Sequence, residues 1–289
     1  MANNNNDLPI RTYQKQFAQL IQTVYGVQGV FAPTFGQLQA LDGVQDNATA
    51  FSLKTNDVPV VVGEYSTDAN TAFGTGTANS SRFGEMKEIK YADVDVPYDF
   101  TWSIHEGLDR FTVNNDLNAA VADRLNLQAQ AKTRLFNKKE GQFLADSATD
   151  IGLDASDVNK LFETAVEKYT DLEVVVPIRA YVTAAVYNAI IDLANVTSGK
   201  GSAVDIDANG MVSFRGIALT KVPSQYMADQ EVIFTPDNIG RAFTGISTAR
   251  TIESTDFDGQ ELQGAGKAGQ FISDDNKKAI FKAAEAPKE

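Results

Sequence analysis

The chain has 289 residues, of which 43% are hydrophobic, so it can fill the core of one large or two modest domains. It has no cysteine, which excludes a disulfide framework and thiolate metal sites, and its single histidine, His105, excludes a multi-histidine metal site. The net charge of −13 repels nucleic-acid phosphates, and no stripe rich in lysine or arginine offsets it, so specific DNA binding is disfavoured.

The amino-terminal part predicts a short helix followed by an irregular arm. Residues 1–7 lack the basic and apolar parts of a secretory signal, and no run in the chain reaches the roughly 18 apolar residues of a membrane span, so we expect a soluble protein. From residue 10 to residue 27, apolar residues recur at three- and four-residue spacing, as on one face of an amphipathic helix. Residues 28–41 have no period, which is typical of an arm that lies against something else.

Residues 58–102 predict a long hairpin. Two β-rich runs, 58–65 and 87–102, flank a segment at 66–84 that is dominated by glycine, serine, threonine and asparagine. Neither face of the second run is cleanly apolar, and an isolated two-stranded hairpin is at best marginally stable in water. We therefore expect this hairpin to lie on a neighbouring molecule, with a surface hairpin of a monomer as the alternative.

The next segment predicts one long helix. Asn114 or Asn115 can cap it, and residues 116–145 contain no proline, and no glycine before Gly141. At 1.5 Å per residue it is a rod of about 45 Å, which suits a strut. Its narrow apolar stripe consists of two offset rows: Leu117, Val121 and Leu125, then Leu127, Ala131 and Leu135.

The rest of the chain predicts a compact module of alternating helices and strands, followed by extended sequence. The expected elements are a helix at 157–170, a strand at 173–182, a helix at 184–194, and strands at 210–221 and 231–234. Three consecutive valines, 174–176, favour a buried strand. A strand pair at 269–272 and 279–281 is expected to rejoin the long helix, so the whole chain is of the α+β class.

Three side chains, Asp205, Asp207 and Asn209, alternate before Gly210 as the first oxygen ligands of a calcium-binding EF-hand loop do. The glutamate that such a loop needs at its twelfth position is Gly216 instead, and a strand follows rather than a helix. Asn-Gly between two β-rich runs is a strong hairpin signal, so we favour a turn and keep a weak calcium site as the alternative.

The other candidates for chemistry are incomplete. The string GTGTAN at 74–79 lacks the third glycine and the helix of a dinucleotide fingerprint. Asp256 and Asp258 precede Gly259, as in a turn, and His105 at the end of a strand favours a structural role. We therefore predict that the protein is not an enzyme and binds no cofactor.

Five strings carry a resemblance to a known family: IRTYQKQFAQLIQTVYGVQ at 10–28, FGTGTANSSRFG at 73–84, IHEGLDRFTVNNDLNAAVADRL at 104–125, GISTARTIESTDFDG at 245–259 and DDNKKAI at 274–280. Through them nearly the whole chain resembles the major head proteins of siphophages of Gram-positive bacteria, members of the Hong Kong 97-type capsid family.

The resemblance implies the fold of that family, with five parts along the chain. They are an amino-terminal arm at 1–41, an extended β-hairpin loop at 42–103, a peripheral domain with a spine helix at 104–150, an axial domain at 151–245, and a return to the peripheral domain with a tail at 246–289.

The resemblance also implies a major capsid protein, found in the virion and, during assembly, in the host cytoplasm. Its copies would form hexamers and pentamers of an icosahedral shell around double-stranded DNA, which they meet only by non-specific proximity. A portal protein would be a partner, and so would a separate scaffolding protein, because the chain begins almost directly with its arm. The expected subunit-interface residues are Arg11, Tyr13 and Phe17 in the arm and Phe73, Arg82 and Phe83 in the loop.

Two alternatives stay open. An encapsulin-like nanocompartment shell shares the architecture but encloses an enzyme, so purified particles without DNA would favour it. A calcium-binding enzyme or binding module would need tight ligand binding at the incomplete motifs that begin at Asp205 or Gly74.

Overall fold

The computed structural model describes residues 28–41, 49–56, 58–68, 71–72, 81–113, 116–196, 204–206 and 212–284. The chain divides into two compact units, one of Val44–Tyr98 and one that joins Met1–Gly43 to Asp99–Glu289. No helix in the described part of the chain combines the length and the apolar character that crossing a membrane requires. The predicted helix at 10–27 lies outside the described residues.

The first sheet of the larger unit has four strands in the order β1-β11-β12-β4. Their bounds are β1 Gln39–Ala40, β4 Phe100–Asp109, β11 Gly240–Glu253 and β12 Gly259–Ile272. β11 and β12 form a long antiparallel hairpin, and β4 pairs antiparallel with β12. Exposed and half-buried side chains alternate along β4, so one face of the sheet is covered and the other is solvated.

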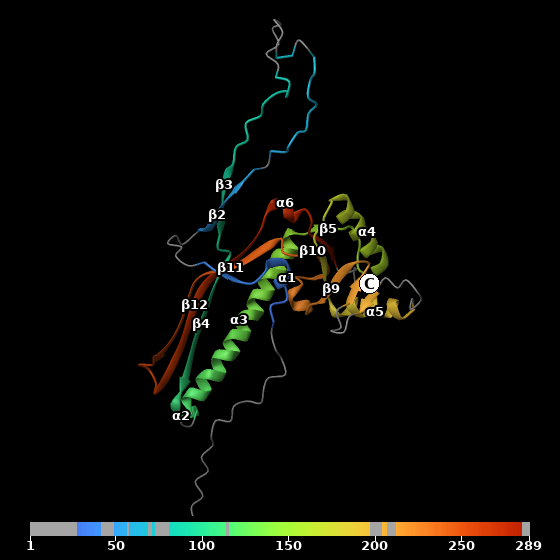
Figure 1. Ribbon diagram of the computed structural model, residues 1–289. Helices are drawn as coiled ribbons and strands as arrows, with labels where there is room; N and C mark the ends of the chain where they lie inside the picture. Colours follow the sequence, from blue (N-terminus) through green and yellow to red (C-terminus); the bar gives the residue numbers. More distant parts are fainter. Residues whose placement is uncertain are drawn as a thin grey trace, which may run out of the picture. The chain divides into compact units, whose positions relative to one another are not determined.

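Helix α3, Leu117–Ser147, runs along this sheet (Figure 1) and confirms the predicted long helix. The predicted caps, Asn114 and Asn115, lie outside the described residues, and the cap is Asp116, whose carboxylate accepts a hydrogen bond from the backbone N–H of Ala119 at 3.3 Å. The predicted apolar stripe is wrong, because Leu125 is exposed and Leu127 and Leu135 are only half-buried. The buried positions lie at the two ends of the helix: Leu117, Ala120, Asn137, Glu140, Gly141, Leu144 and Ala145.

The second sheet of this unit has seven strands in the order β5-β13-β10-β6-β9-β8-β7. Their bounds are β5 Thr149–Asp150, β6 Ile178–Val182, β7 Val204–Ile206, β8 Val212–Phe214, β9 Ile217–Lys221, β10 Gln230–Pro236 and β13 Phe281–Ala284. Helices α4, Val158–Asp171, and α5, Ala184–Val196, confirm two predicted helices. The shared core includes Leu161, Phe162, Ile190 and Phe234, all fully buried.

Short helices complete the larger unit: α1 Ala32–Phe35, α2 Arg110–Val113, the 3₁₀ turn η1 Ser224–Tyr226 and α6 Asp274–Lys277. The predicted strand pair at 269–272 and 279–281 is wrong. β12 belongs to the first sheet and β13 to the second, with α6 between them in the chain. The segment does rejoin the long helix, because Lys282 Nζ donates a hydrogen bond to the backbone oxygen of Ala145 at 2.8 Å.

Two other predicted strands differ from the structure for local reasons. The strand predicted at 173–182 is shorter in the structure, because β6 begins only at Ile178. Glu173 takes a positive φ of 55°, and Pro177 has no N–H to donate to a ladder. The valines between them are therefore not in a buried strand, and Val175 is 96% exposed. The run at 210–221 divides into β8 and β9, since Arg215 and Gly216, with φ of 52° and 81°, form a tight turn between them.

The smaller unit is built on an antiparallel pair, β2 Thr49–Thr55 and β3 Ala92–Pro97. The predicted hairpin is therefore present, but its paired strands differ from those expected. Residues 58–65 are extended without forming a strand, and the end of the run at 87–102 belongs to β4 in the larger unit. Pro97, which cannot donate to a ladder, stands where the pairing with β2 ends.

Candidate subunit-interface surfaces

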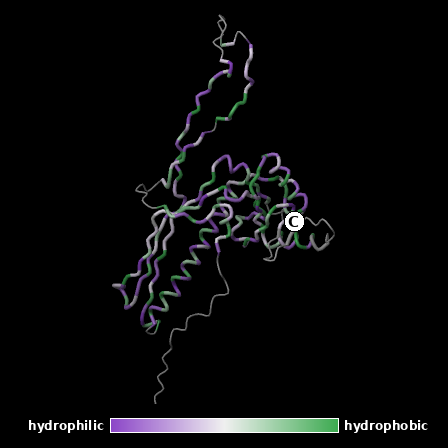
Figure 2. Tube along the Cα trace, in the orientation of Figure 1, coloured by the Kyte–Doolittle hydropathy of each residue, from purple (hydrophilic) through white to green (hydrophobic). Residues whose placement is uncertain are grey.

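The smaller unit exposes a large share of the molecule's apolar surface. Of the seventeen large hydrophobic side chains exposed among the described residues, ten lie in it, and the colours of Figure 2 show hydrophobic residues on both sides of its long loop. They are Val58, Val60, Val61, Val62, Tyr65, Phe83, Met86, Ile89, Tyr91 and Val94. A concentration of exposed large apolar side chains is typical of a surface for protein–protein contact.

Two predicted interface residues lie on this unit, next to each other. Phe83 is 84% exposed, and its ring meets the ring of Tyr65 edge-on at a centroid distance of 5.2 Å. Arg82 connects the part of the loop that follows its tip with the part that precedes it. Its backbone oxygen accepts a hydrogen bond from Ser66 N at 3.0 Å, and its Nε donates to the backbone oxygen of Thr71 at 3.4 Å. The other predicted interface residues, Phe73, Arg11, Tyr13 and Phe17, lie outside the described residues.

In the larger unit, α3 packs against β4, and the contacts are made by aromatic rings and long polar side chains. Phe136 meets Phe100 edge-on at a centroid distance of 5.5 Å, and Lys132 Nζ lies 5.0 Å from the centroid of the Trp102 ring. Trp102 in turn covers β12, since a Cβ built at Gly266 would lie 2.8 Å from the indole. Glycine is therefore required at this position for the indole to lie flat on the strand.

An ion pair fixes the amino-terminal half of α3 to the same strand. The carboxylate of Glu106 accepts hydrogen bonds from Arg124, through Nε at 2.7 Å and through a second guanidinium nitrogen, and from Gln128 Nε2 at 2.6 Å. The hydrogen bond from Arg124 lowers the pKa of Glu106 below its usual value. Charge therefore adds to the apolar contacts of Leu117 and Ala120 in holding this half of the helix.

The arm is fastened to the carboxyl-terminal half of α3. Asn137 Oδ1 accepts a hydrogen bond from the backbone N–H of Val30 at 3.0 Å, and its Nδ2 donates to the backbone oxygen of Gln28 at 2.8 Å. Further along, Phe31 is fully buried and packs edge-on against the ring of Tyr181 at a centroid distance of 4.7 Å. The arm from Gln28 to Leu41 is therefore an integral part of the larger unit.

The described residues form no metal-binding group of three or more His, Cys, Asp or Glu side chains. Of the calcium candidates, Asp205 lies in β7, while Asp207 and Asn209 lie outside the described residues. β7 and β8 pair antiparallel from Val204↔Phe214 to Ile206↔Val212, which confirms the hairpin that Asn-Gly predicted.

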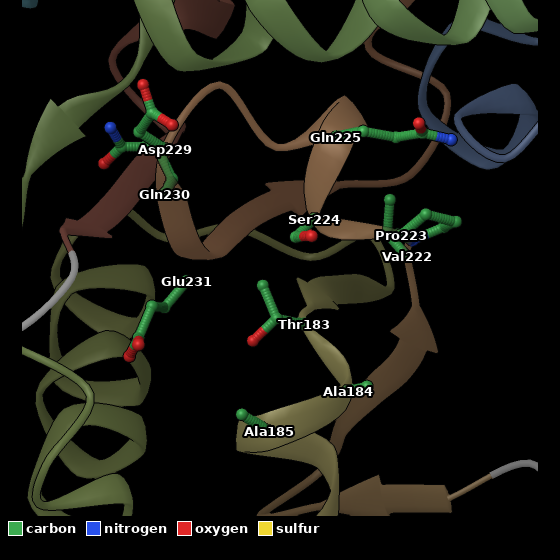
Figure 3. Close-up of a pocket in the computed structure, with 10 residues that line it drawn as sticks. All are labelled: Thr183, Ala184, Ala185, Val222, Pro223, Ser224, Gln225, Asp229, Gln230 and Glu231. Carbon is green, nitrogen blue, oxygen red and sulfur yellow. The ribbon is translucent and has the colours of Figure 1, made fainter.

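Two further places in the larger unit carry polar side chains that could take part in chemistry, His105 and a cleft. His105 lies on the solvated face of the first sheet, with Nε2 3.5 Å from Glu261 Oε2. The cleft, of about 780 Å³, presents the hydroxyls of Thr183 and Ser224 (Figure 3). The ten residues drawn there include no histidine, lysine or cysteine, and their acidic side chains are Asp229 and Glu231, so the cleft lacks the Ser-His-Asp and Ser-Lys sets that activate a hydroxyl.

Comparison by sequence matches the chain to no protein family and to no curated protein. Comparison by structure finds solved structures with a similar fold. The chain aligns over 96% of its length with 93% of a chain in the mature capsid of bacteriophage PhiM1, at a TM-score of 0.64 and 8% identity. It aligns over 95% of its length with 93% of a chain in the capsid of cyanophage P-SCSP1u, at 0.62 and 10%. A chain from Mycobacterium phage Che8 matches at 0.59 and 16%, covering 96% of this chain and 97% of that one.

The chain has the fold of bacteriophage capsid subunits. In both comparisons the shared fold covers nearly all of this chain and nearly all of the capsid chain, so no large part of it lies outside the capsid fold. The expected mixture of helices and strands is confirmed with it.

Proposed function

We propose that this chain is the major capsid protein of a tailed bacteriophage, with the Hong Kong 97-type fold. Its copies assemble into hexamers and pentamers that close an icosahedral shell around double-stranded DNA, and it carries out no catalysis. The observation that carries the proposal is the capsid fold together with a smaller unit whose apolar side chains, such as Val60 and Met86, are about nine-tenths exposed.

The exposed side chains of the smaller unit account for the need to assemble. A two-stranded ribbon with this much apolar surface in water is stabilised when a neighbour covers it. Contacts that are each modest add up over a closed shell, where obligate interfaces are on the order of 2,000 Å² or more per subunit. We assign Phe73, Arg82 and Phe83 of the loop, and Arg11, Tyr13 and Phe17 of the arm, to these interfaces.

The proposal extends to the parts and partners of the chain. We assign the smaller unit to the extended loop, α3 to the spine helix of a peripheral domain, and the seven-stranded sheet to an axial domain. A scaffolding protein and a portal protein are partners during assembly in the host cytoplasm. The charge of −13 suits a shell that must release its genome, because binding to DNA strengthens with each phosphate that a basic side chain neutralises.

The test is expression of the full chain with a scaffolding partner, followed by electron microscopy of the particles. The full chain should form closed shells, and a variant that lacks residues 66–84 should yield folded subunits without shells. Normal shells from the deletion variant would contradict the role of the loop. The matched control is Lys54→Gln. It removes an exposed ion pair with Asp93 between strands β2 and β3 of the same unit and should leave assembly unchanged.

A further inference from the structure

Glu140 of helix α3 carries a buried carboxylate that has no partner. Its side chain is 9% exposed, and within the described part of the chain it makes no hydrogen bond and no ion pair. It lines a cavity of about 250 Å³ that lies between α3 and the arm segment Gln28–Leu41. Ionisation of such a carboxylate is costly, because the charge loses water and gains no donor in exchange.

No other group at the cavity balances a charge on Glu140. Among the described residues, only the arm and α3 line the cavity. The arm contains no charged or titratable side chain between Gln28 and Leu41. On α3, Lys132 is the other charged residue of the lining, and its Nζ lies over the Trp102 ring, 5.0 Å from the centroid. Ionisation of Glu140 therefore changes the charge of the contact between arm and helix.

The side chain that fastens the arm is next to Glu140. Asn137 and Glu140 are three residues apart on α3, so their side chains are neighbours on one face of the helix, and both line the cavity. Asn137 Oδ1 accepts the hydrogen bond of the Val30 amide at 3.0 Å, and Asn137 Nδ2 donates to the backbone oxygen of Gln28 at 2.8 Å. Rotation of these two neighbouring side chains can bring Nδ2 to the carboxylate instead.

We propose that Glu140 is a pH-sensitive switch that releases the arm segment 28–30 from helix α3. While Glu140 is neutral, Asn137 binds the backbone of the arm, as in the structure. Once Glu140 is ionised, its carboxylate takes the hydrogen bond from Asn137 Nδ2, because a hydrogen bond to an ionised acceptor is roughly twice as strong as one to a neutral carbonyl. Gln28 then loses its donor, and the turned amide no longer presents Oδ1 to Val30.

The released segment ends at Phe31, because the arm beyond it is held by the core. The Phe31 ring is fully buried and packs edge-on against the Tyr181 ring at a centroid distance of 4.7 Å. Gln28 and Gly29 are exposed and Val30 is only half-buried, so their release uncovers little apolar surface. The two hydrogen bonds of Asn137 are therefore the main contacts that the switch has to break.

The switch operates around neutral pH. Burial raises the pKa of Glu140 to about 7 in the structure, in which the arm is bound. The bound arm belongs to the protonated form, so it is fully present below the ordinary value of 4.5 and is lost as the pH rises through about 7. The released fraction should rise by up to about tenfold for each pH unit between about pH 5 and pH 7 and level off above about pH 8.

Hydrogen exchange of the Val30 amide in the unassembled full-length chain tests the switch. The protection factor, which corrects for the intrinsic pH dependence of exchange, should fall at least about tenfold between pH 5 and pH 8, while amides in α4 keep their protection. Glu140→Gln, which cannot ionise, should keep Val30 protected at both pH values. The matched control is Glu167→Gln, which removes an exposed carboxylate of α4 and should show the same fall as the wild type. A change of less than about twofold in the wild type, or an equal fall in Glu140→Gln, overturns the proposal.

The part assigned to Asn137 has its own readout. The side-chain amide resonances of Asn137 should shift with pH in the wild type, with the same midpoint as the protection of Val30, and stay constant in Glu140→Gln. Asn137→Ala should leave Val30 unprotected already at pH 5 and so remove the pH dependence. Resonances that do not follow the pH, or pH-dependent protection that persists in Asn137→Ala, overturn the proposal. These measurements concern the separate subunit, so their outcome does not depend on whether the chain forms shells.

Discussion

The carboxylate of Glu106 accepts a hydrogen bond from Arg124 Nε at 2.7 Å and thereby joins strand β4 to helix α3. The pair lies far from Leu144, a fully buried residue near the carboxyl end of the helix. The helix thus has buried apolar positions towards both ends, and the ion pair adds a charged contact in its amino-terminal half.

Replacing Arg124 by Gln should lower the free energy of unfolding by about 1 kcal/mol at pH 7, since the side chains of both partners are partly exposed and solvent screens the pair. The pKa of Glu106 is lowered in the folded state, so this stabilisation is present above its ordinary value of 4.5 and is lost as the pH falls below that value. Urea denaturation at pH 7 and pH 3 checks this. A loss that is the same at both pH values would show that packing, not charge, is responsible.

Replacing Gly141 by Ala should destabilise the protein although alanine is the better helix former. A Cβ at this position would lie 1.7 Å from the backbone oxygen of Tyr226, so the turn η1 must move away from α3. We expect a loss of about 2–3 kcal/mol, which outweighs the gain of about 1 kcal/mol in helix propensity. Thermal unfolding measures it, and Gly63→Ala, with nothing within 4 Å of its Cβ, is the control. A more stable Gly141→Ala variant would contradict the close approach.

The helices were predictable because their signals are local. A polar residue before the helix and the absence of proline within it were enough to predict α3, although the capping residue is Asp116 and not Asn114 or Asn115, and the same signals predict α4 behind Asp157. Strand pairing is not local. Residues 58–65 have the β-branched composition of a strand but no ladder in the described chain, whereas β4 pairs with β12, which lies more than 150 residues further along. Composition alone does not specify such partners.

The sequence did not predict the hydrogen bonds between Asn137 and the arm, or the burial of Glu140, for the same reason. Asn137 and the backbone groups that it binds are more than 100 residues apart in sequence, and in a helix with a mostly polar surface nothing marks Asn137 or Glu140 as buried. Gly141 was the one signal in the sequence that this part of the helix is buried. A glycine inside a long helix lowers helix stability, so it suggests that another backbone packs closely there, as that of Tyr226 does. Arg82 and Phe83 were predicted as contacts, and Phe83 is exposed as such a contact requires.

Replacing Asn137 by Ala should loosen the arm. The variant leaves Val30 N–H and Gln28 C=O without their partner, at a cost of about 2–3 kcal/mol for the two partly buried hydrogen bonds. Hydrogen exchange at the Val30 amide should accelerate while exchange in α4 stays slow. Asn276→Ala, which removes one exposed hydrogen bond to the backbone oxygen of Ile239, is the matched control and should change neither. Unchanged protection of Val30 would mean that apolar packing around Phe31 alone holds the arm.

Replacing Glu140 by Gln should stabilise the unassembled subunit at pH 8 and leave it nearly unchanged at pH 4. Burial raises the pKa of Glu140 from 4.5 to about 7 in the folded chain, so folding takes up a proton between these values. The stabilisation that belongs to the protonated form is complete below 4.5 and is lost as the pH rises through 7, which costs the wild type up to about 3 kcal/mol at pH 8. Urea denaturation of both proteins across this range should give curves that diverge as the pH rises. Parallel curves would show that Glu140 is already paired in the separate subunit, and Glu167→Gln, on the partly exposed surface of α4, controls for the loss of one negative charge.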